Sequence, residues 1–148
     1  MENKVFDQLQ FIVIKLGNEQ FGINIKYVQN IVRMMSITRV PKSPDFIAGI
    51  INLRGEIIPV MSLRKRFNLE SDVYSKDTRI IIIKYEGTMM GIIVDVVKEV
   101  ISLTEEQIEK MSYDANDERG AYLLGVGKLG SELVTLLNVQ NVIEYVKE

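Results

Sequence analysis

Residues 11–32 read FIVIKLGNEQFGINIKYVQNIV, and a similar pattern returns at residues 80–101 as IIIIKYEGTMMGIIVDVVKEVI. The two stretches align without a gap, Gly22 falls on Gly91, and most apolar positions coincide. Each copy has two runs rich in β-branched residues on either side of a short turn that contains glycine, which is typical of a β-hairpin. Repetition of this kind indicates a chain built from two related units.

A second pair of stretches repeats in the same order along the chain. Residues 49–67, GIINLRGEIIPVMSLRKRF, align without a gap on residues 125–143, GVGKLGSELVTLLNVQNVI. Ser62 falls on Asn138, and both residue types are good helix N-caps ahead of a short amphipathic segment. Two successive matches in one order favour duplication over chance similarity between β-rich segments.

Strand signals dominate both copies of the repeat. Each copy offers about five short strands, which is enough for a small closed barrel without exposed edges. Short helices are predicted to follow Ser62, Thr104 and Asn138. We therefore expect a mainly β protein that is a single domain over residues 1–148, with lobe 1 at about 9–72 and lobe 2 at about 77–148.

The composition is that of a soluble globular domain, and it argues against several classes of protein. The 148 residues are 47% hydrophobic and carry a formal net charge of -2, whereas nucleic-acid binders normally have a basic excess. The chain has no cysteine and no histidine, which removes disulfides, thiolate metal sites and the commonest general base. No apolar run approaches the roughly 18 residues of a membrane span. We expect a cytoplasmic protein that neither binds nucleic acid nor inserts into a membrane.

Two features could suggest an enzyme but are better explained structurally. Residues 125–130 match the dinucleotide fingerprint G-x-G-x-x-G, which requires a βαβ unit. Here the repeat places them opposite residues 49–55 in a β lobe, so a strand end and turn is the better interpretation. Asp95 lies in an apolar run without an evident acid–base partner. We interpret it as a polar residue at a barrel edge or as the ion-pair partner of an arginine.

Two further groups of residues are open to more than one interpretation. The basic cluster at residues 64–66 is interpreted as the solvated face of a short helix. The paired methionines could form an adaptable binding surface, although ordinary packing and turn positions explain them equally well. These methionines are Met34, Met35, Met89 and Met90.

Three stretches together resemble the CheW family of bacterial chemotaxis, whose members couple chemoreceptors to the histidine kinase CheA. The stretches are LGNEQFGINIKYVQNIV, RVPKSPDFIAGIINLRGEIIPVMSLRKRF and MMGIIVDVVKEVISLTEEQI, and the resemblance runs in order from about Phe11 to Ile143. Its most specific part is Asn52-Leu53-Arg54-Gly55, followed by Pro59 and Leu63-Arg64.

The resemblance implies two SH3-like, five-stranded β-barrel lobes with an apolar groove between them. The groove would bind the tip of the receptor's cytoplasmic helical hairpin, and the first lobe would contact the regulatory domain of CheA. The implied protein is a scaffold with no cofactor and no enzymatic activity. It would be cytoplasmic and would associate with membrane receptor arrays through its partners.

The resemblance also assigns residues to the two interfaces. Those implied in receptor binding are Val28, Asn30, Ile31, Asn52, Arg54, Gly91, Val97 and Val100. Those implied in kinase binding are Ile37 and Gly49. Asn30 falls where the family often has an acidic residue, so this chain lacks that charge.

Arg54 lies within the apolar run GIINLRGEIIPV at residues 49–60, which should exclude a charge unless its tip reaches water or a partner. We predict that its stem lies along the barrel and that its guanidinium reaches the groove rim, where it can bond to a receptor helix. The alternative is an internal ion pair, with Asp95 as the candidate, that braces the two lobes. Gly55 would allow a tight turn behind it.

Other functions remain open from the sequence. An adaptor of the same family could serve a two-component pathway unrelated to motility, and the sequence does not separate these possibilities. A small β-barrel that binds a ligand or nucleic acid belongs to a different class, and the lack of clustered aromatic residues counts against nucleic acid. An enzyme is the least expected class.

Overall fold

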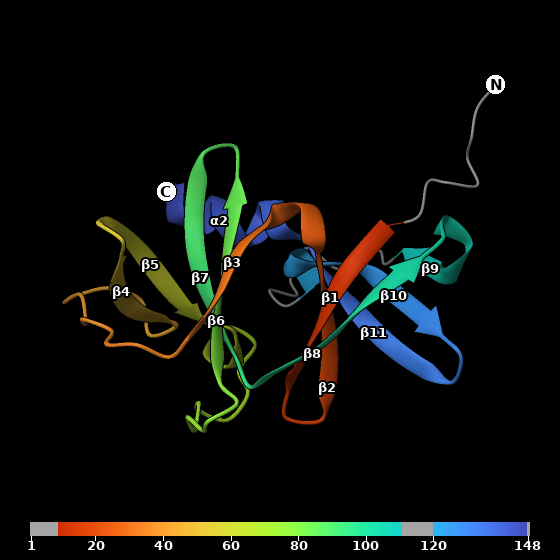
Figure 1. The fold of residues 1–148 in the computed structure, drawn as a ribbon, viewed down its shortest axis with the longest axis horizontal. Helices are drawn as coiled ribbons and strands as arrows, with labels where there is room; N and C mark the ends of the chain where they lie inside the picture. Colours follow the sequence, from red (N-terminus) through yellow and green to blue (C-terminus); the bar gives the residue numbers. More distant parts are fainter. Residues whose placement is uncertain (1–8, 111–119, 148) are drawn as a thin grey trace.

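The computed structural model describes residues 9–110 and 120–147, and its strands form two sheets that lie beside each other (Figure 1). Sheet A has six strands in the order β8-β1-β2-β11-β10-β9. These strands are β8 (Val96–Leu103), β1 (Leu9–Leu16), β2 (Glu19–Asn24), β11 (Glu132–Leu137), β10 (Leu123–Leu129) and β9 (Ile108–Lys110). Sheet B has five strands in the order β3-β6-β7-β5-β4. These are β3 (Val28–Arg33), β6 (Arg79–Tyr85), β7 (Thr88–Val94), β5 (Glu56–Ser62) and β4 (Ile47–Leu53). The mainly β fold is therefore confirmed, with β9 as a short sixth strand in one sheet.

Helical segments are short and begin at the predicted caps. The α-helices are α1 (Leu63–Arg66) and α2 (Val139–Lys147), and the 3-10 turns are η2 (Ile25–Tyr27), η3 (Glu105–Gln107) and η4 (Gly120–Tyr122). Ser62 Oγ accepts a hydrogen bond from Lys65 N at 3.2 Å, and Asn138 Oδ1 accepts one from Asn141 N at 3.1 Å. These bonds satisfy amide groups that a first helical turn leaves free. The helix predicted after Thr104 is a single 3-10 turn.

The repeat seen in the sequence maps strand for strand onto the structure. Its first stretch relates β1, β2 and β3 to β6, β7 and β8, and its second relates β4, β5 and α1 to β10, β11 and α2. The five equivalent strands follow the same order in both sheets. Even the parallel pairings correspond, since Leu136 lies opposite Gly22 in sheet A and Val60 lies opposite Gly91 in sheet B. The two sheets are thus pseudo-symmetric copies.

Each sheet nevertheless combines strands from both halves of the chain. Sheet A takes β1 and β2 from the first half and β8, β9, β10 and β11 from the second. Sheet B takes β3, β4 and β5 from the first half and β6 and β7 from the second. The predicted lobe boundaries, about 9–72 and about 77–148, are therefore wrong as boundaries of the two sheets. The sequence pattern predicts hairpins, because their two strands are neighbours in the chain. It does not predict the parallel β2–β11 and β5–β7 pairings, which join strands that are distant in the chain and decide which strands share a sheet.

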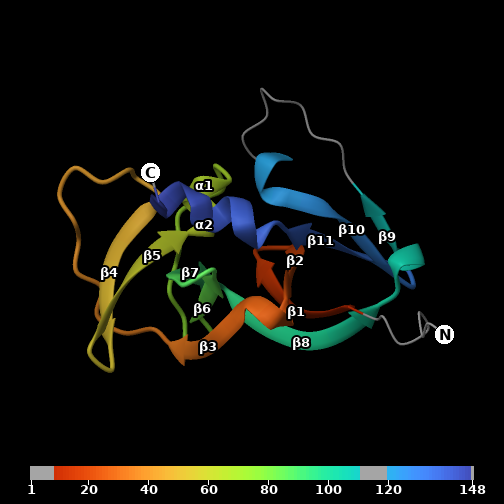
Figure 2. The same cartoon turned by 90° about the horizontal axis from the view of Figure 1, so that it is seen from above.

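The largest apolar cluster lies between the two sheets and joins them. We call it the central cluster. It includes Ile14 and Phe21 from sheet A, Ile81 and Ile92 from sheet B, and Val142 from α2, all of them fully buried. Helix α2 leaves the end of β11 in sheet A and crosses to contact β6 and β7 of sheet B (Figure 2). Smaller clusters fill each sheet separately, and we call the one around Ile58, Val60 and Ile80 the sheet B cluster. Burial between the sheets makes them one cooperative unit.

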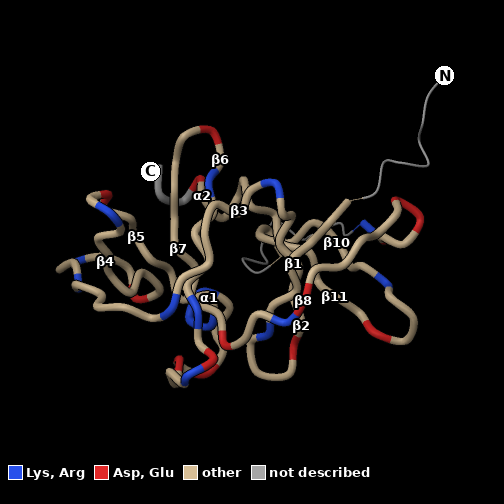
Figure 3. Tube along the Cα trace, viewed as in Figure 1, with Lys and Arg blue, Asp and Glu red and all other residues tan. Residues whose placement is uncertain are grey.

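Charged residues of both signs are interspersed along the chain trace (Figure 3). The interpretation of residues 64–66 as a solvated helix face is wrong for two of the three. Arg64 forms an ion pair with Asp95 at 2.6 Å, and the Arg66 guanidinium lies 4.6 Å from the Phe46 ring centroid and 4.5 Å from that of Tyr122. A four-residue helix at the junction of two sheets turns most of its side chains towards neighbouring elements.

Candidate functional site

The edge strands β3 and β8 mark the junction between the sheets. Strand β3 borders sheet B although it follows β2 of sheet A through η2, and β8 borders sheet A although it follows β7 of sheet B. Both strands lie on the same face of the molecule in Figure 2. Because the repeat relates β3 to β8, this face has equivalent residues from both copies.

A β-bulge in each edge strand determines which side chains share a face. The register shifts between Val28 and Asn30 in β3 and, at the equivalent place, between Val97 and Glu99 in β8. One extra residue reverses the alternation of side chains along a strand. Val28 therefore shares a face with Ile31, and Val97 with Val100. We call these four residues the junction residues.

The junction residues form an inner and an outer pair. Val28 and Val97 are half-buried and pack against the central cluster. Ile31 and Val100 keep 42% and 50% of their surface exposed. Apolar side chains repeated on the edge strands of both sheets, on one face of the molecule, can receive an apolar face of another protein. Asn30, also predicted for this site, lies half-buried on β3 opposite Ile82.

Beside the junction, Asp95 holds the two sheets together. Its carboxylate accepts hydrogen bonds from Gly17 N at 2.8 Å, from Arg64 Nε at 3.0 Å and from Arg64 Nη2 at 2.6 Å. Gly17 belongs to the β1–β2 turn of sheet A, and Arg64 belongs to α1, which follows β5 of sheet B. The hydrogen bonds from Arg64, followed by that from Gly17, hold the pKa of the Asp95 carboxyl below its ordinary value against the opposing effect of burial.

Arg54 differs from both sequence predictions made for it. Leu53 pairs with Glu56, so Arg54 and Gly55 form the two-residue turn of the β4–β5 hairpin, with φ angles of 54° and 88°. Asn52 Oδ1 supports this turn by accepting a hydrogen bond from Gly55 N at 3.0 Å. Arg54 is exposed at this turn and is not part of a strand of the barrel.

The proposed Arg54–Asp95 ion pair is also wrong, because Arg64 occupies that carboxylate. In the sheet order, the β4–β5 hairpin lies at the opposite edge of sheet B from β3. The structure therefore does not group Arg54 or Asn52 with the junction residues, and instead places them together at the tip of a hairpin.

The residues predicted to bind the kinase lie together at the outer edge of sheet B. Thr38 and Ile50 exchange two backbone hydrogen bonds of 2.9 Å, which align the chain around Ile37 beside β4. Ile37 lines a pocket of about 510 Å³, which we call the sheet B pocket, and Gly49 is buried beneath the same segment. The residues that line it are Met34, Met35, Ser36, Ile37, Ala48 and Tyr74.

Gly91 is not on a groove wall. It is buried in β7, where an added Cβ would lie 2.8 Å from Ile80 Cγ2 and 3.3 Å from Val60 Cγ2. Its role is to allow close packing inside sheet B. Gly22 has the same role in sheet A, where an added Cβ would lie 2.9 Å from Leu136 Cδ2.

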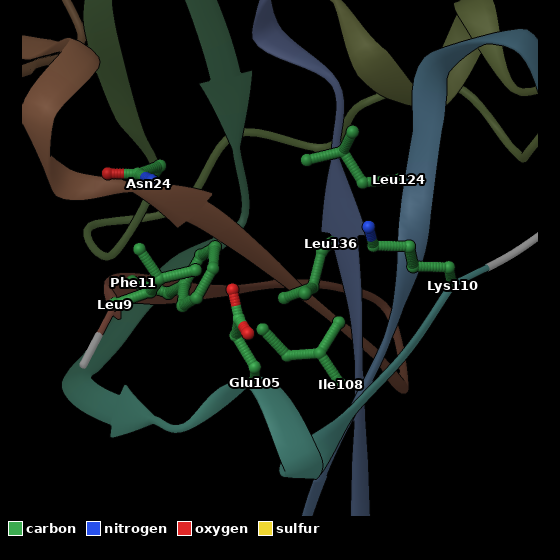
Figure 4. A pocket seen from close by; sticks show the side chains of 8 residues that line it. All are labelled: Leu9, Phe11, Asn24, Glu105, Ile108, Lys110, Leu124 and Leu136. Atoms are coloured by element: carbon green, nitrogen blue, oxygen red, sulfur yellow. The ribbon is translucent and has the colours of Figure 1, made fainter. Parts of the chain in front are cut away.

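A second pocket, of about 590 Å³, lies in sheet A and was missed in the sequence analysis (Figure 4). Phe11, Leu136 and Ile108 form apolar walls, and Glu105 and Lys110 bring one charge of each sign. The repeat relates its Glu105 to Ser36 and its Leu124 to Ala48, so the two pockets share two pseudo-symmetric lining positions. Its lining residues come from segments far apart in the chain, so no local sequence signal indicates it.

Within residues 9–110 and 120–147, no cluster of three or more acidic side chains could hold a metal ion. None of the helices described there is long and apolar enough to cross a membrane.

Comparisons with known proteins agree on one family. The family model for the CheW-like domain matches residues 10–147. A chemotaxis protein CheW from Klebsiella aerogenes is 37% identical over 134 residues, which cover 90% of this chain and 81% of that protein. A CheW from Helicobacter pylori is 32% identical, with coverage of 92% and 82%. The crystal structure of the scaffolding protein TtCheW from Thermoanaerobacter tengcongensis superposes with a TM-score of 0.82 at 39% identity, covering 88% of this chain and 89% of that one.

Proposed function

The chain belongs to the CheW-like family, and on that premise we propose that it is a chemotaxis scaffold that couples chemoreceptors to the histidine kinase CheA. The observation that carries the proposal is the apolar face formed by the junction residues of β3 and β8. An amphipathic helical hairpin could lay its apolar side there, because Ile31 and Val100 present exposed aliphatic side chains on one face of the molecule. The chain itself would supply no catalysis and no cofactor.

The kinase would dock at a different place, on the outer edge of sheet B. Ile37 and the sheet B pocket support this assignment, because they present half-buried apolar side chains beside the outer edge of β4. Separate surfaces for receptor and kinase would let one molecule hold both at once. Such a scaffold would reside in the cytoplasm and reach the membrane through its receptors. Individual affinities in the micromolar range, about -8 kcal/mol, would suffice where many copies assemble.

Ile31→Asp and Val100→Asp are each expected to weaken receptor binding at least tenfold while leaving the melting temperature nearly unchanged. Both side chains are largely exposed, so a carboxylate there remains hydrated in the free protein and loses water only under a docked helix. Titration of a receptor cytoplasmic hairpin measures the effect. Leu133→Asp is the matched control, because this side chain is 60% exposed on β11, away from the junction.

Receptor binding that survives both junction substitutions, or that falls equally in the Leu133 variant, would contradict this site. Val28→Asp is a less specific test. Its side chain packs against the central cluster, so the substitution should lower both stability and binding.

Arg54→Gly is expected to leave the fold intact and to change receptor binding far less than the junction substitutions do, because Arg54 lies in the β4–β5 hairpin at the opposite edge of sheet B from β3. Glycine adopts the positive φ of this turn more readily than arginine, so the substitution removes the guanidinium without adding backbone strain. Circular dichroism should show an unchanged fold, and titration with the receptor hairpin should show an affinity near that of the wild-type protein. A several-fold loss in the folded variant would mean that the receptor interface extends to Arg54, as the family resemblance implies.

The co-purification of this chain with a CheA regulatory domain and a receptor hairpin tests the proposal as a whole. An adaptor for a two-component pathway unrelated to motility would use the same surfaces, and it would differ in binding another kinase. Failure to bind either partner would overturn the coupling function.

A further inference from the structure

The methionines of this protein are not equally accessible. Among the described residues, Met61 and Met90 are fully buried. Met34, Met35 and Met89 are half-buried, and all three pack against the sheet B cluster. Since the chain has no cysteine, thioethers are its only sulfur groups. The accessible thioethers of the described chain are therefore concentrated at one end of the molecule.

Two of these thioethers line the sheet B pocket. Met34 and Met35 lie beside Ile37 and Ala48 on its wall. The pseudo-symmetric positions at the sheet A end are Leu103 for Met34, Thr104 for Met35 and Gln20 for Met89. The same fold thus presents oxidisable sulfur at one end and none at the equivalent positions of the other.

We propose that Met34 and Met35 form an oxidation-sensitive site, and that their conversion to sulfoxides by hydrogen peroxide weakens docking at the sheet B pocket. The docking half of this inference rests on the proposed kinase interface. In the reaction, the thioether sulfur attacks one peroxide oxygen, an S–O bond forms and the O–O bond breaks. The sulfur is oxidised by two electrons and the peroxide is reduced. The released hydroxide takes the proton from the oxygen that is now bound to sulfur and leaves as water.

The consequence follows from polarity. A thioether is a soft apolar group that fits irregular apolar surfaces, whereas a sulfoxide carries a strong hydrogen-bond acceptor. The pocket wall around Met34 and Met35 is mainly apolar, with Ile37 and Ala48 as neighbours. A partner that covers the pocket would bury the sulfoxide oxygens with few donors to satisfy them. The change is reversible, because methionine sulfoxide reductases restore the thioether.

The test treats the full chain with hydrogen peroxide below the concentration that unfolds it. Peptide mass spectrometry should show conversion of Met34 and Met35 well before Met61 and Met90. Affinity for the CheA regulatory domain should then fall about tenfold and recover after reductase treatment. Affinity for a receptor hairpin serves as the internal control and should not change, because the four junction residues are valines and isoleucine.

A Met34→Leu/Met35→Leu variant separates oxidation at this pocket from damage elsewhere. Leucine conserves volume and cannot be oxidised, so the ratio of treated to untreated affinity should stay near one for this protein. If the wild-type protein keeps full kinase affinity after both methionines are converted to sulfoxides, the proposed effect of oxidation on docking is wrong. The proposed kinase interface would not be contradicted by that result. An equal loss in the leucine variant, or conversion of Met61 and Met90 at the same rate, would also overturn the proposed effect of oxidation. An untreated protein that does not bind the kinase would overturn the proposed interface and this effect together.

Discussion

Gly49→Ala is expected to destabilise the protein by about 3 kcal/mol, a fall of roughly 10 °C in melting temperature. An added Cβ at Gly49 would lie 2.2 Å from Thr38 O and 2.8 Å from Ile37 Cγ2, and the φ of 148° is one that other residues rarely adopt. The obstructing atom is a backbone oxygen held in the Thr38–Ile50 bridge, so it cannot move aside as a side chain could. Denaturant titration followed by circular dichroism measures the loss.

The control for this substitution is Gly130→Ala. Gly130 also has a positive φ, 63°, but an added Cβ there would meet no atom within 4 Å, so the expected cost is only roughly 1 kcal/mol. Equal losses for the two variants would show that backbone conformation alone, without the clash, sets the cost. Because Gly49 is also a predicted kinase contact, any loss of kinase binding in its variants should be normalised to the folded fraction.

Asp95→Ala is expected to cost about 2–3 kcal/mol. The carboxylate accepts three hydrogen bonds, and its loss leaves the Arg64 guanidinium and the Gly17 amide without that acceptor at a site where the two charged side chains are only 26% and 17% exposed. Asp45→Ala is the matched control. That carboxylate is 87% exposed and lies 3.7 Å from Lys65 Nζ, so its removal should change stability by less than about 0.5 kcal/mol.

The Asp95 contribution should also depend on pH. Since its pKa in the folded protein lies below the ordinary value of 3.8, the stabilisation is present in full well above pH 4. It is lost as the pH falls through the lower, folded-state pKa. The difference in unfolding free energy between the wild-type protein and Asp95→Ala should therefore shrink as the solution is acidified below about pH 4. A difference that stays constant down to the acid transition would show that Asp95 acts through packing and not through its charge.

The local parts of this fold could be predicted from sequence because local chemistry determines them. The turns at residues 17–18 and 86–87 lie between paired strands as expected, and the helix N-caps at Ser62 and Asn138 are confirmed. The duplication was visible because the apolar pattern of each hairpin survives in both copies. The family also followed from sequence, since its most specific residues are contiguous.

The features that sequence reasoning missed depend on contacts between distant segments or on a single backbone angle. Nothing near Asp95 in the chain indicates that Arg64, and not Arg54, would reach it. The run around Arg54 looked like one apolar strand, although the two residues Arg54 and Gly55 form a turn that divides it. The bulges in β3 and β8 likewise could not be predicted from the alternation of apolar and polar residues, because each bulge interrupts that alternation. They nevertheless decide which junction residues share a face.

The interleaving of the two halves has a consequence for synthesis on the ribosome. All five strands of sheet B lie between residues 28 and 94, so they are all translated before β8, β9, β10 and β11 of sheet A. The β1–β2 hairpin precedes all the other described strands, yet its parallel neighbour β11 is the last of them. The β2 edge of this hairpin must therefore stay unpaired until β11 has been translated. Sheet A can thus be completed only after sheet B, although its first hairpin precedes every strand of sheet B in the chain.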